Sequence, residues 1–89
     1  MSRRRAYNAD TLAIMERFFA ALDASIANKL VKNVTRFCND YGIDKRHLYA
    51  QRKDLGLGFF EVGWLVPLVR DCGVSSLWLL TGRGTMFPQ

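Results

Sequence analysis

The chain is poor in the side chains that form disulfides and hold metal ions. Its 89 residues include two cysteines and one histidine. Cys38 and Cys72 show no C-x-x-C spacing, and both fall on the apolar faces of predicted helices. We interpret them as reduced core residues. His47 has no cysteine, histidine or carboxylate at metal-ligand spacing, so no metal site is expected.

Long apolar runs are also absent. No run approaches the roughly 20 residues that cross a bilayer. The basic N-terminus leads into no hydrophobic stretch of the signal-peptide type. We therefore expect a cytoplasmic protein without a membrane partner.

The usual arrangements of catalytic residues are missing as well. The eight acidic residues are scattered rather than paired, and no Ser/His/Asp or Cys/His set falls on a shared face. The phosphate-cradling pattern G-x-x-x-x-G-K-[ST] does not occur. The sequence predicts that the protein is not an enzyme and has neither a cofactor nor a small-molecule substrate.

What the chain does contain is an apolar fraction of 49% and a charged fraction of 24%, which is typical of one small globular domain. We expect that domain to cover residues 10–87. Residues 1–9 carry Arg3, Arg4 and Arg5 and are expected to be a basic, flexible arm. A solvating tail has the same composition.

The net charge of +5 is unevenly distributed along the chain. Residues 28–53 hold seven Lys or Arg against two Asp, and the N-terminal arm adds three Arg. The remainder holds three basic and six acidic residues. A basic pole on a mildly acidic body is typical of a protein that binds a polyanion. A solvated surface that only aids solubility gives the same pattern.

Apolar residues recur at helical spacing throughout, which predicts an all-α domain of five helices and no strand. Asn8 or Asp10 is expected to cap the first helix, and Pro67 lies where the fourth helix either begins or bends. The expected helices cover about residues 10–27, 34–41 and 44–53, a segment ending near Cys72, and residues 77–81.

The window Val34–Lys53 is the most informative part of the chain. Gly42 separates two short helices, and a glycine there accommodates the positive φ that ends the first of them. Asp44 is expected to cap the second helix, with Leu48 turned inward. A short helix, a tight turn and a strongly basic helix form the arrangement that places a helix in the major groove of DNA.

The outer face of the second helix supplies the expected DNA contacts. Side chains three and four residues apart share that face, and Arg can donate to both O6 and N7 of guanine. The residues expected to read bases are Lys45, Arg46, Tyr49, Ala50 and Lys53. The residues expected to contact phosphates are Lys32, Thr35, Arg36, His47, Arg52 and the arm residues Arg3, Arg4 and Arg5.

Two segments together resemble a known family. The spacing of Phe37, Cys38, Tyr41, Gly42, Ile43 and Leu48 resembles the helix-turn-helix of phage CI-repressor and Cro-like proteins. The ending GVSSLWLLTGRGTMF, residues 73–87, is similar to the G-V-S-x-x-W-L-L-T-G-x-G ending of the CI-repressor DNA-binding domain.

The resemblance implies a five-helix lambda-repressor-like domain. It also implies that the protein is a homodimer on double-stranded DNA and a transcriptional regulator, bacterial or phage-encoded, of phage, prophage or mobile-element genes. It further implies either a stand-alone Cro-like regulator or an excised fragment of a longer repressor.

The chain departs from the family at three positions. Cys38 replaces the usual alanine. Gln51 stands where the family buries an aliphatic residue. Val34 occupies a position at which many relatives carry a glutamine that binds phosphate.

A second function remains open: a protein-interaction module on the same fold, such as an antitoxin-like or phage accessory protein. Its contact surface would be Leu57, Phe59, Phe60, Met86 and Phe87, so the exposure of these side chains bears on that alternative. For a dimer, the last helix with Met86 and Phe87 is the expected interface.

Overall fold

The longest helix, α1 (Ala9–Ala27), is the element against which α4 and α5 pack. The computed structural model describes residues 6–88. Asn8 caps α1, because its side-chain oxygen accepts a hydrogen bond from the backbone N–H of Thr11 at 2.9 Å. The buried face of α1 carries the apolar residues that the helical spacing predicts, among them Met15, Phe18 and Leu22.

The next two helices are short and closely connected. α2 (Val34–Tyr41) is capped by Asn33, and α3 (Lys45–Lys53) is capped by Asp44. Gly42 ends α2 in the left-handed conformation with φ of 65°, a conformation that costs other residues free energy because of their Cβ atom. Only three residues therefore separate the two helices.

The second half of the chain contains a short 3-10 helix, η1 (Val62–Trp64), followed directly by α4 (Leu65–Cys72) and then by α5 (Ser76–Thr81). Pro67 lies in the first turn of α4, where backbone N–H groups have no partner within the helix. The helix therefore begins just before the proline. Ser75 caps α5 through a bond from the N–H of Trp78.

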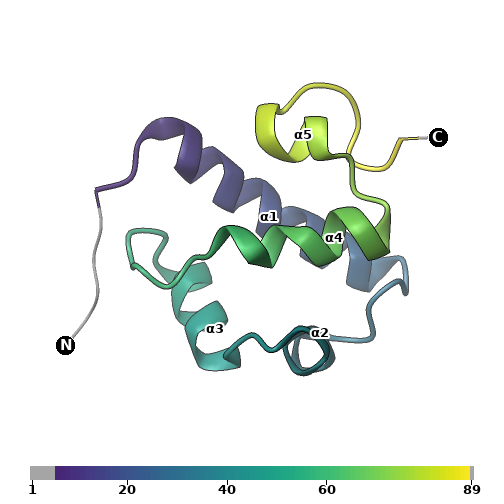
Figure 1. Cartoon of the computed structure of the whole chain (residues 1–89), viewed down its shortest axis with the longest axis horizontal. Helices are drawn as coiled ribbons and strands as arrows, with labels where there is room; N and C mark the ends of the chain where they lie inside the picture. Colours follow the sequence, from purple (N-terminus) through teal and green to yellow (C-terminus); the bar gives the residue numbers. More distant parts are fainter. Residues whose placement is uncertain (1–5, 89) are drawn as a thin grey trace.

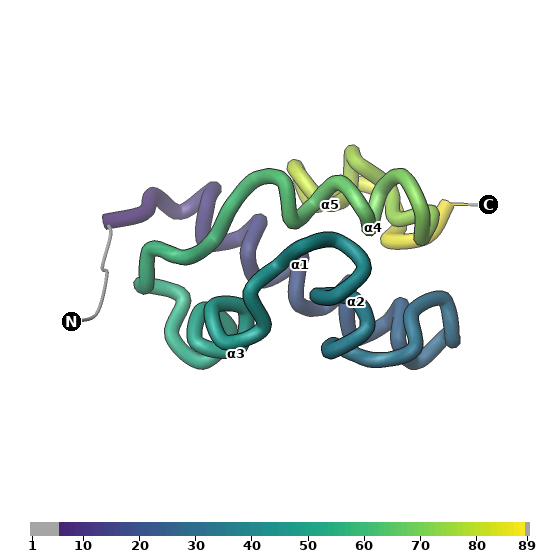
Figure 2. The backbone as a smooth tube through the Cα atoms, turned by 60° about the horizontal axis from the view of Figure 1, so that its bottom comes forward, coloured from purple at the N-terminus to yellow at the C-terminus, as the bar shows by residue number. Residues whose placement is uncertain are grey.

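Figure 1 shows α2 and α3 along one side of the molecule and α5 on the other, with α1 and α4 crossing between them. The turned view in Figure 2 shows the same order. The edge formed by α2 and α3 is thus separated from α5 by the body of the domain.

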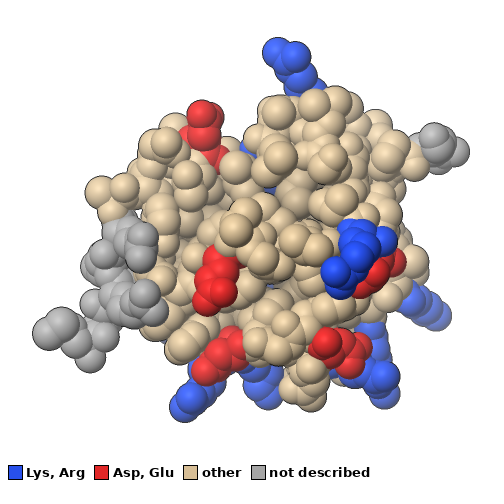
Figure 3. All heavy atoms as spheres, viewed as in Figure 1, with Lys and Arg blue, Asp and Glu red and all other residues tan. Residues whose placement is uncertain are grey.

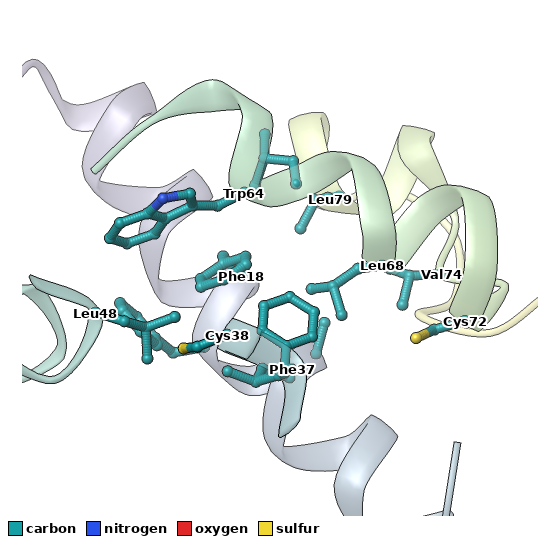
Figure 4. Close-up of a cluster of buried hydrophobic side chains, with 13 residues drawn as sticks. Phe18, Phe37, Cys38, Leu48, Trp64, Leu68, Cys72, Val74 and Leu79 are labelled. Atoms are coloured by element: carbon teal, nitrogen blue, oxygen red, sulfur yellow. The ribbon is translucent and has the colours of Figure 1, made fainter. Parts of the chain in front are cut away.

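A single hydrophobic core holds these helices together. The ring of Phe18 lies at its centre, 6.4 Å from the ring of Phe37 in α2 and 5.9 Å from that of Trp64 in η1. Figure 4 shows Phe37, Cys38 and Leu48 below Phe18, Leu68 and Val74 to its right and Leu79 above. Both helices of the basic window are therefore anchored by their apolar faces.

The expected five α-helices are present within residues 6–88, and this part of the chain contains no strand. Cys38 and Cys72 are buried and free. Burial raises the pKa of both thiols, which keeps them protonated. The arm residues Arg3, Arg4 and Arg5 lie outside the described residues.

One backbone feature could not be expected from the residue type. Lys29, just after α1, adopts a left-handed conformation with φ of 63°. The N–H groups of Leu30 and Val31 turn back to the carbonyl oxygen of Ser25, which fixes this conformation. Glycine usually occupies such a position.

Changing Gly42 to alanine should destabilise the fold by about 1–2 kcal/mol, because the new Cβ is disfavoured at positive φ. No heavy atom lies within 4 Å of that Cβ position, so the loss would come from the backbone alone. Gly63→Ala is the matched control, since its Cβ also meets nothing within 4 Å and its φ is not positive. Urea unfolding measures both free energies. Equal stability of the two variants would contradict this explanation of the turn.

Candidate nucleic-acid interface

The solvent-facing side of α3 carries most of the residues expected to read bases. Lys45, Arg46, Tyr49 and Lys53 are exposed, whereas Ala50 is half-buried. The Arg46 side chain is the most open of the ion-paired residues, with 88% of its surface exposed. The opposite side of α3 is anchored by Leu48, which is fully buried. The helix therefore presents one basic face that is not needed for core packing.

An ionised carboxylate, that of Asp44, caps the start of α3. The Asp44 carboxylate accepts hydrogen bonds from the N–H groups of Arg46, at 2.9 Å, and His47, at 3.4 Å. Desolvation favours the neutral acid, but these donors outweigh it and lower the pKa of Asp44. The ionised cap also lies 3.7 Å from Nε of Arg46. This long contact on the surface leaves the guanidinium available to another acceptor.

The residues expected to contact phosphates fall into two groups. Lys32 and Thr35 are exposed at the start of α2. Arg36, one residue further, is exposed but pairs with Asp40 at 3.1 Å. Such a surface pair contributes little and can exchange for a phosphate. This part of the expected interface is therefore accessible.

Arg52 is placed differently from the expectation. It forms an ion pair with Asp23 of α1, and its guanidinium lies 5.5 Å from the centre of the Phe19 ring. These contacts tie α3 to α1. Because it already has a carboxylate partner, Arg52 is less available to a phosphate than Lys53 beside it.

His47 is held by a neighbour that the sequence did not indicate. Its imidazole stacks on the ring of Phe59, with the ring centres 4.2 Å apart and the planes at 9°. Its Nε2 lies 3.8 Å from the Asp44 carboxylate. The side chain is half-exposed, so a fixed imidazole lies at the edge of the basic face.

Gln51 explains how Phe59 reaches that position. The Gln51 side chain is fully buried, and its Nε2 donates to the carbonyl oxygen of Leu55 at 2.9 Å. Its Oε1 accepts from the N–H of Phe59, also at 2.9 Å. A further contact of 3.4 Å joins Nε2 to the Met15 sulfur. The amide thus links α3, α1 and the segment that follows α3.

The exposed basic residues of α2 and α3 lie along one edge of the molecule. Figure 3 shows Lys and Arg side chains projecting from the lower edge, where α2 and α3 lie, and further charged side chains at the right and at the top of the view, over α4 and α5. Acidic side chains are interspersed along that edge, as the Arg36–Asp40 pair illustrates. Within residues 6–88, Lys45 and Lys53 of α3 form no ion pair, and neither do Lys29 and Lys32 before α2.

Sequence reasoning missed Asp23 and Phe59. Asp23 lies 29 residues before Arg52 and Phe59 lies 12 residues after His47, so neither pairing follows a helical repeat. The Gln51 side chain was expected only as an unusual residue at an aliphatic position. A buried glutamine that needs partners is the one signal that could have pointed to the segment after α3.

Residues 6–88 contain neither a group of metal-binding side chains nor a helix that could span a membrane. No group of three or more His, Cys, Asp or Glu side chains in that range is arranged to hold a metal ion. No helix there combines the length and apolar character needed to cross a membrane.

The comparisons with known proteins returned no relative: no family model, no curated protein and no solved structure matches this chain.

Gln51→Leu should destabilise the protein by about 1–3 kcal/mol, because it keeps the bulk but leaves the Phe59 N–H and Leu55 carbonyl without their partner. Hydrogen exchange should accelerate at the Phe59 amide more than at amides within α1. Urea unfolding and amide exchange measure the two effects. Unchanged exchange at Phe59 would contradict the role assigned to the Gln51 amide.

Proposed function

We propose that the protein is a sequence-specific DNA-binding transcriptional regulator of the phage CI-repressor and Cro-like type. In this proposal, α2 and α3 form a helix-turn-helix, and α3 enters the major groove. The observation that carries it is the exposed face of α3: Lys45, Arg46, Tyr49 and Lys53 point to solvent while Leu48 and the buried side chain of Gln51 anchor the helix.

The chemistry of this face suits base recognition. Arg46 lies in the first turn of α3, the part of a recognition helix that lies deepest in the groove, and its guanidinium can donate twice to a guanine. Half-buried Ala50 adds no bulk between the longer side chains, so the helix backbone can approach the bases closely. Tyr49 can donate to a phosphate or pack on a sugar.

The surroundings of α3 suit contacts to the DNA backbone. Lys32 and Thr35 lie at the start of α2, where free backbone N–H groups also favour a phosphate. Arg36, next to Thr35 in α2, and His47, in the first turn of α3, could add further phosphate contacts. Arg52 could add one only if its guanidinium left Asp23 for a phosphate. Backbone contacts of this kind fix orientation without reading sequence.

One short reading helix specifies few base pairs, so the proposal includes a homodimer with half-sites about 34 Å apart. Such a regulator would act in the bacterial cytoplasm on phage, prophage or mobile-element genes. Neither catalysis nor a cofactor forms part of the proposal.

The surface expected for the alternative, a protein-interaction module, is only partly exposed. Leu57, Phe59, Phe60, Met86 and Phe87 are all partly buried, and the last four pack against the core. Such a module would bind DNA weakly and lose that binding by about 0.2 M salt.

Lys53→Ala should weaken binding to any duplex and reduce the slope of log K against log salt by about 1, because one positive charge that faces the polyanion is lost. Fluorescence anisotropy with a labelled mixed-sequence duplex measures this slope. Arg83→Ala is the matched control: it removes the same charge from the segment after α5, on the side of the molecule away from α3 (Figure 1). Equal slopes for the two variants would contradict the placement of α3 in the DNA interface.

A further inference from the structure

Arg52 of α3 is held by two neighbours that lie on one side of α1. Its guanidinium forms an ion pair with the Asp23 carboxylate, and its Cζ lies 5.5 Å from the centre of the Phe19 ring. Asp23 and Phe19 are four residues apart in α1, so both face the same side of that helix. A carboxylate and the face of an aromatic ring both attract a guanidinium. α1 therefore offers Arg52 two favourable contacts at once.

Arg52 also shares one side of α3 with residues that are proposed to meet DNA. Lys45, Tyr49 and Arg52 follow each other at intervals of four and three residues, which brings them to one side of the helix. The Arg52 side chain is 36% exposed, and that of Asp23 is 52% exposed. A competing anion can therefore reach the guanidinium while it is paired with Asp23.

The chemistry of the pair resembles that of a contact to DNA. A carboxylate and a phosphate both accept hydrogen bonds from the forked donors of a guanidinium. In this protein the Asp23 carboxylate occupies the position on Arg52 that a phosphate would take. The two lysines of α3 differ in this respect, because Lys45 and Lys53 form no ion pair within residues 6–88.

We propose that Asp23 competes with DNA for Arg52 and so limits the affinity of α3 for the DNA backbone. The inference rests on the proposed function, because it concerns the same side of α3. Phosphate contacts carry no sequence information, so the competition restrains binding to any duplex. An exposed ion pair contributes little free energy in water, which allows a phosphate to replace the carboxylate. Asp23 thus acts through Arg52 and does not itself contact DNA.

A purely structural role for Asp23 makes the opposite prediction. If the Asp23–Arg52 pair only holds α3 against α1, removing the charge of Asp23 loosens α3 and weakens DNA binding. If Asp23 competes with a phosphate, removing the charge frees Arg52 and strengthens DNA binding. The sign of the change in affinity therefore separates the two roles.

The test uses Asp23→Asn, which keeps the size of the side chain and removes its charge. Glu16→Gln is the matched control, because Glu16 is exposed, lies two turns before Asp23 on the same side of α1, and forms no ion pair within residues 6–88. Arg52→Gln, alone and combined with Asp23→Asn, completes a double-mutant cycle. Fluorescence anisotropy with a labelled mixed-sequence duplex gives the affinity at several salt concentrations, and circular dichroism measures the helical content of each variant.

At physiological salt, Asp23→Asn should tighten binding about two- to fivefold, the factor that corresponds to an exposed ion pair. It should also steepen the slope of log K against log salt by about 1, because Arg52 gains a phosphate. Glu16→Gln should change both quantities much less. In the Arg52→Gln background, Asp23→Asn should have no more effect than Glu16→Gln.

Unchanged or weaker binding by Asp23→Asn would overturn the inference and leave the proposed function standing. An equal gain with and without Arg52 would also overturn it, because the total charge rather than the ion pair would then be responsible. A wild type that binds no duplex would overturn the proposed function, and the inference with it.

Discussion

The hydrogen bonds of the Gln51 side-chain amide determine how the segment after α3 meets the rest of the domain. A buried amide without partners costs about 1–3 kcal/mol, so it must be satisfied at both ends. Leu55 and Phe59 do this through their backbone, and Phe59 is thereby placed on the imidazole of His47. A single buried polar group thus couples core packing to the edge of the exposed basic face.

The same structure separates positive charges that support the fold from those that remain available. Arg52 faces Asp23 and the Phe19 ring, and Arg36 faces Asp40. Lys45 and Lys53 form no ion pair among residues 6–88. Composition alone counts all these residues equally. Their partners determine which of them could neutralise a phosphate without first giving up an internal contact: Lys45 and Lys53 on α3 could, and so could Lys32 before α2.

Local signals predicted much of the fold. Helical spacing and the expected caps Asn8 and Asp44 give helix bounds within a residue or two of those observed, because caps act within one turn of the chain. The exposed positions of α3 followed from the same periodicity. The left-handed Lys29 did not, since its conformation is imposed by hydrogen bonds from residues that follow it.

Contacts between segments far apart in the chain could not be predicted from these local signals. The Arg52–Asp23 ion pair and the His47–Phe59 stack depend on how α1, α3 and the segment after α3 pack together. The exposed face of α3 could therefore be predicted, whereas the carboxylates that compete for its charges could be identified only from the structure.

The central claim is that the exposed face of α3 reads a DNA sequence. Selection of bound duplexes from a random pool at physiological salt tests it most directly, with wild-type protein and Arg46→Ala selected in parallel. The account predicts a palindromic motif for the wild type and loss of base preference at one position of each half-site for Arg46→Ala. Failure of the wild type to enrich any motif, or an identical motif from the variant, would contradict it.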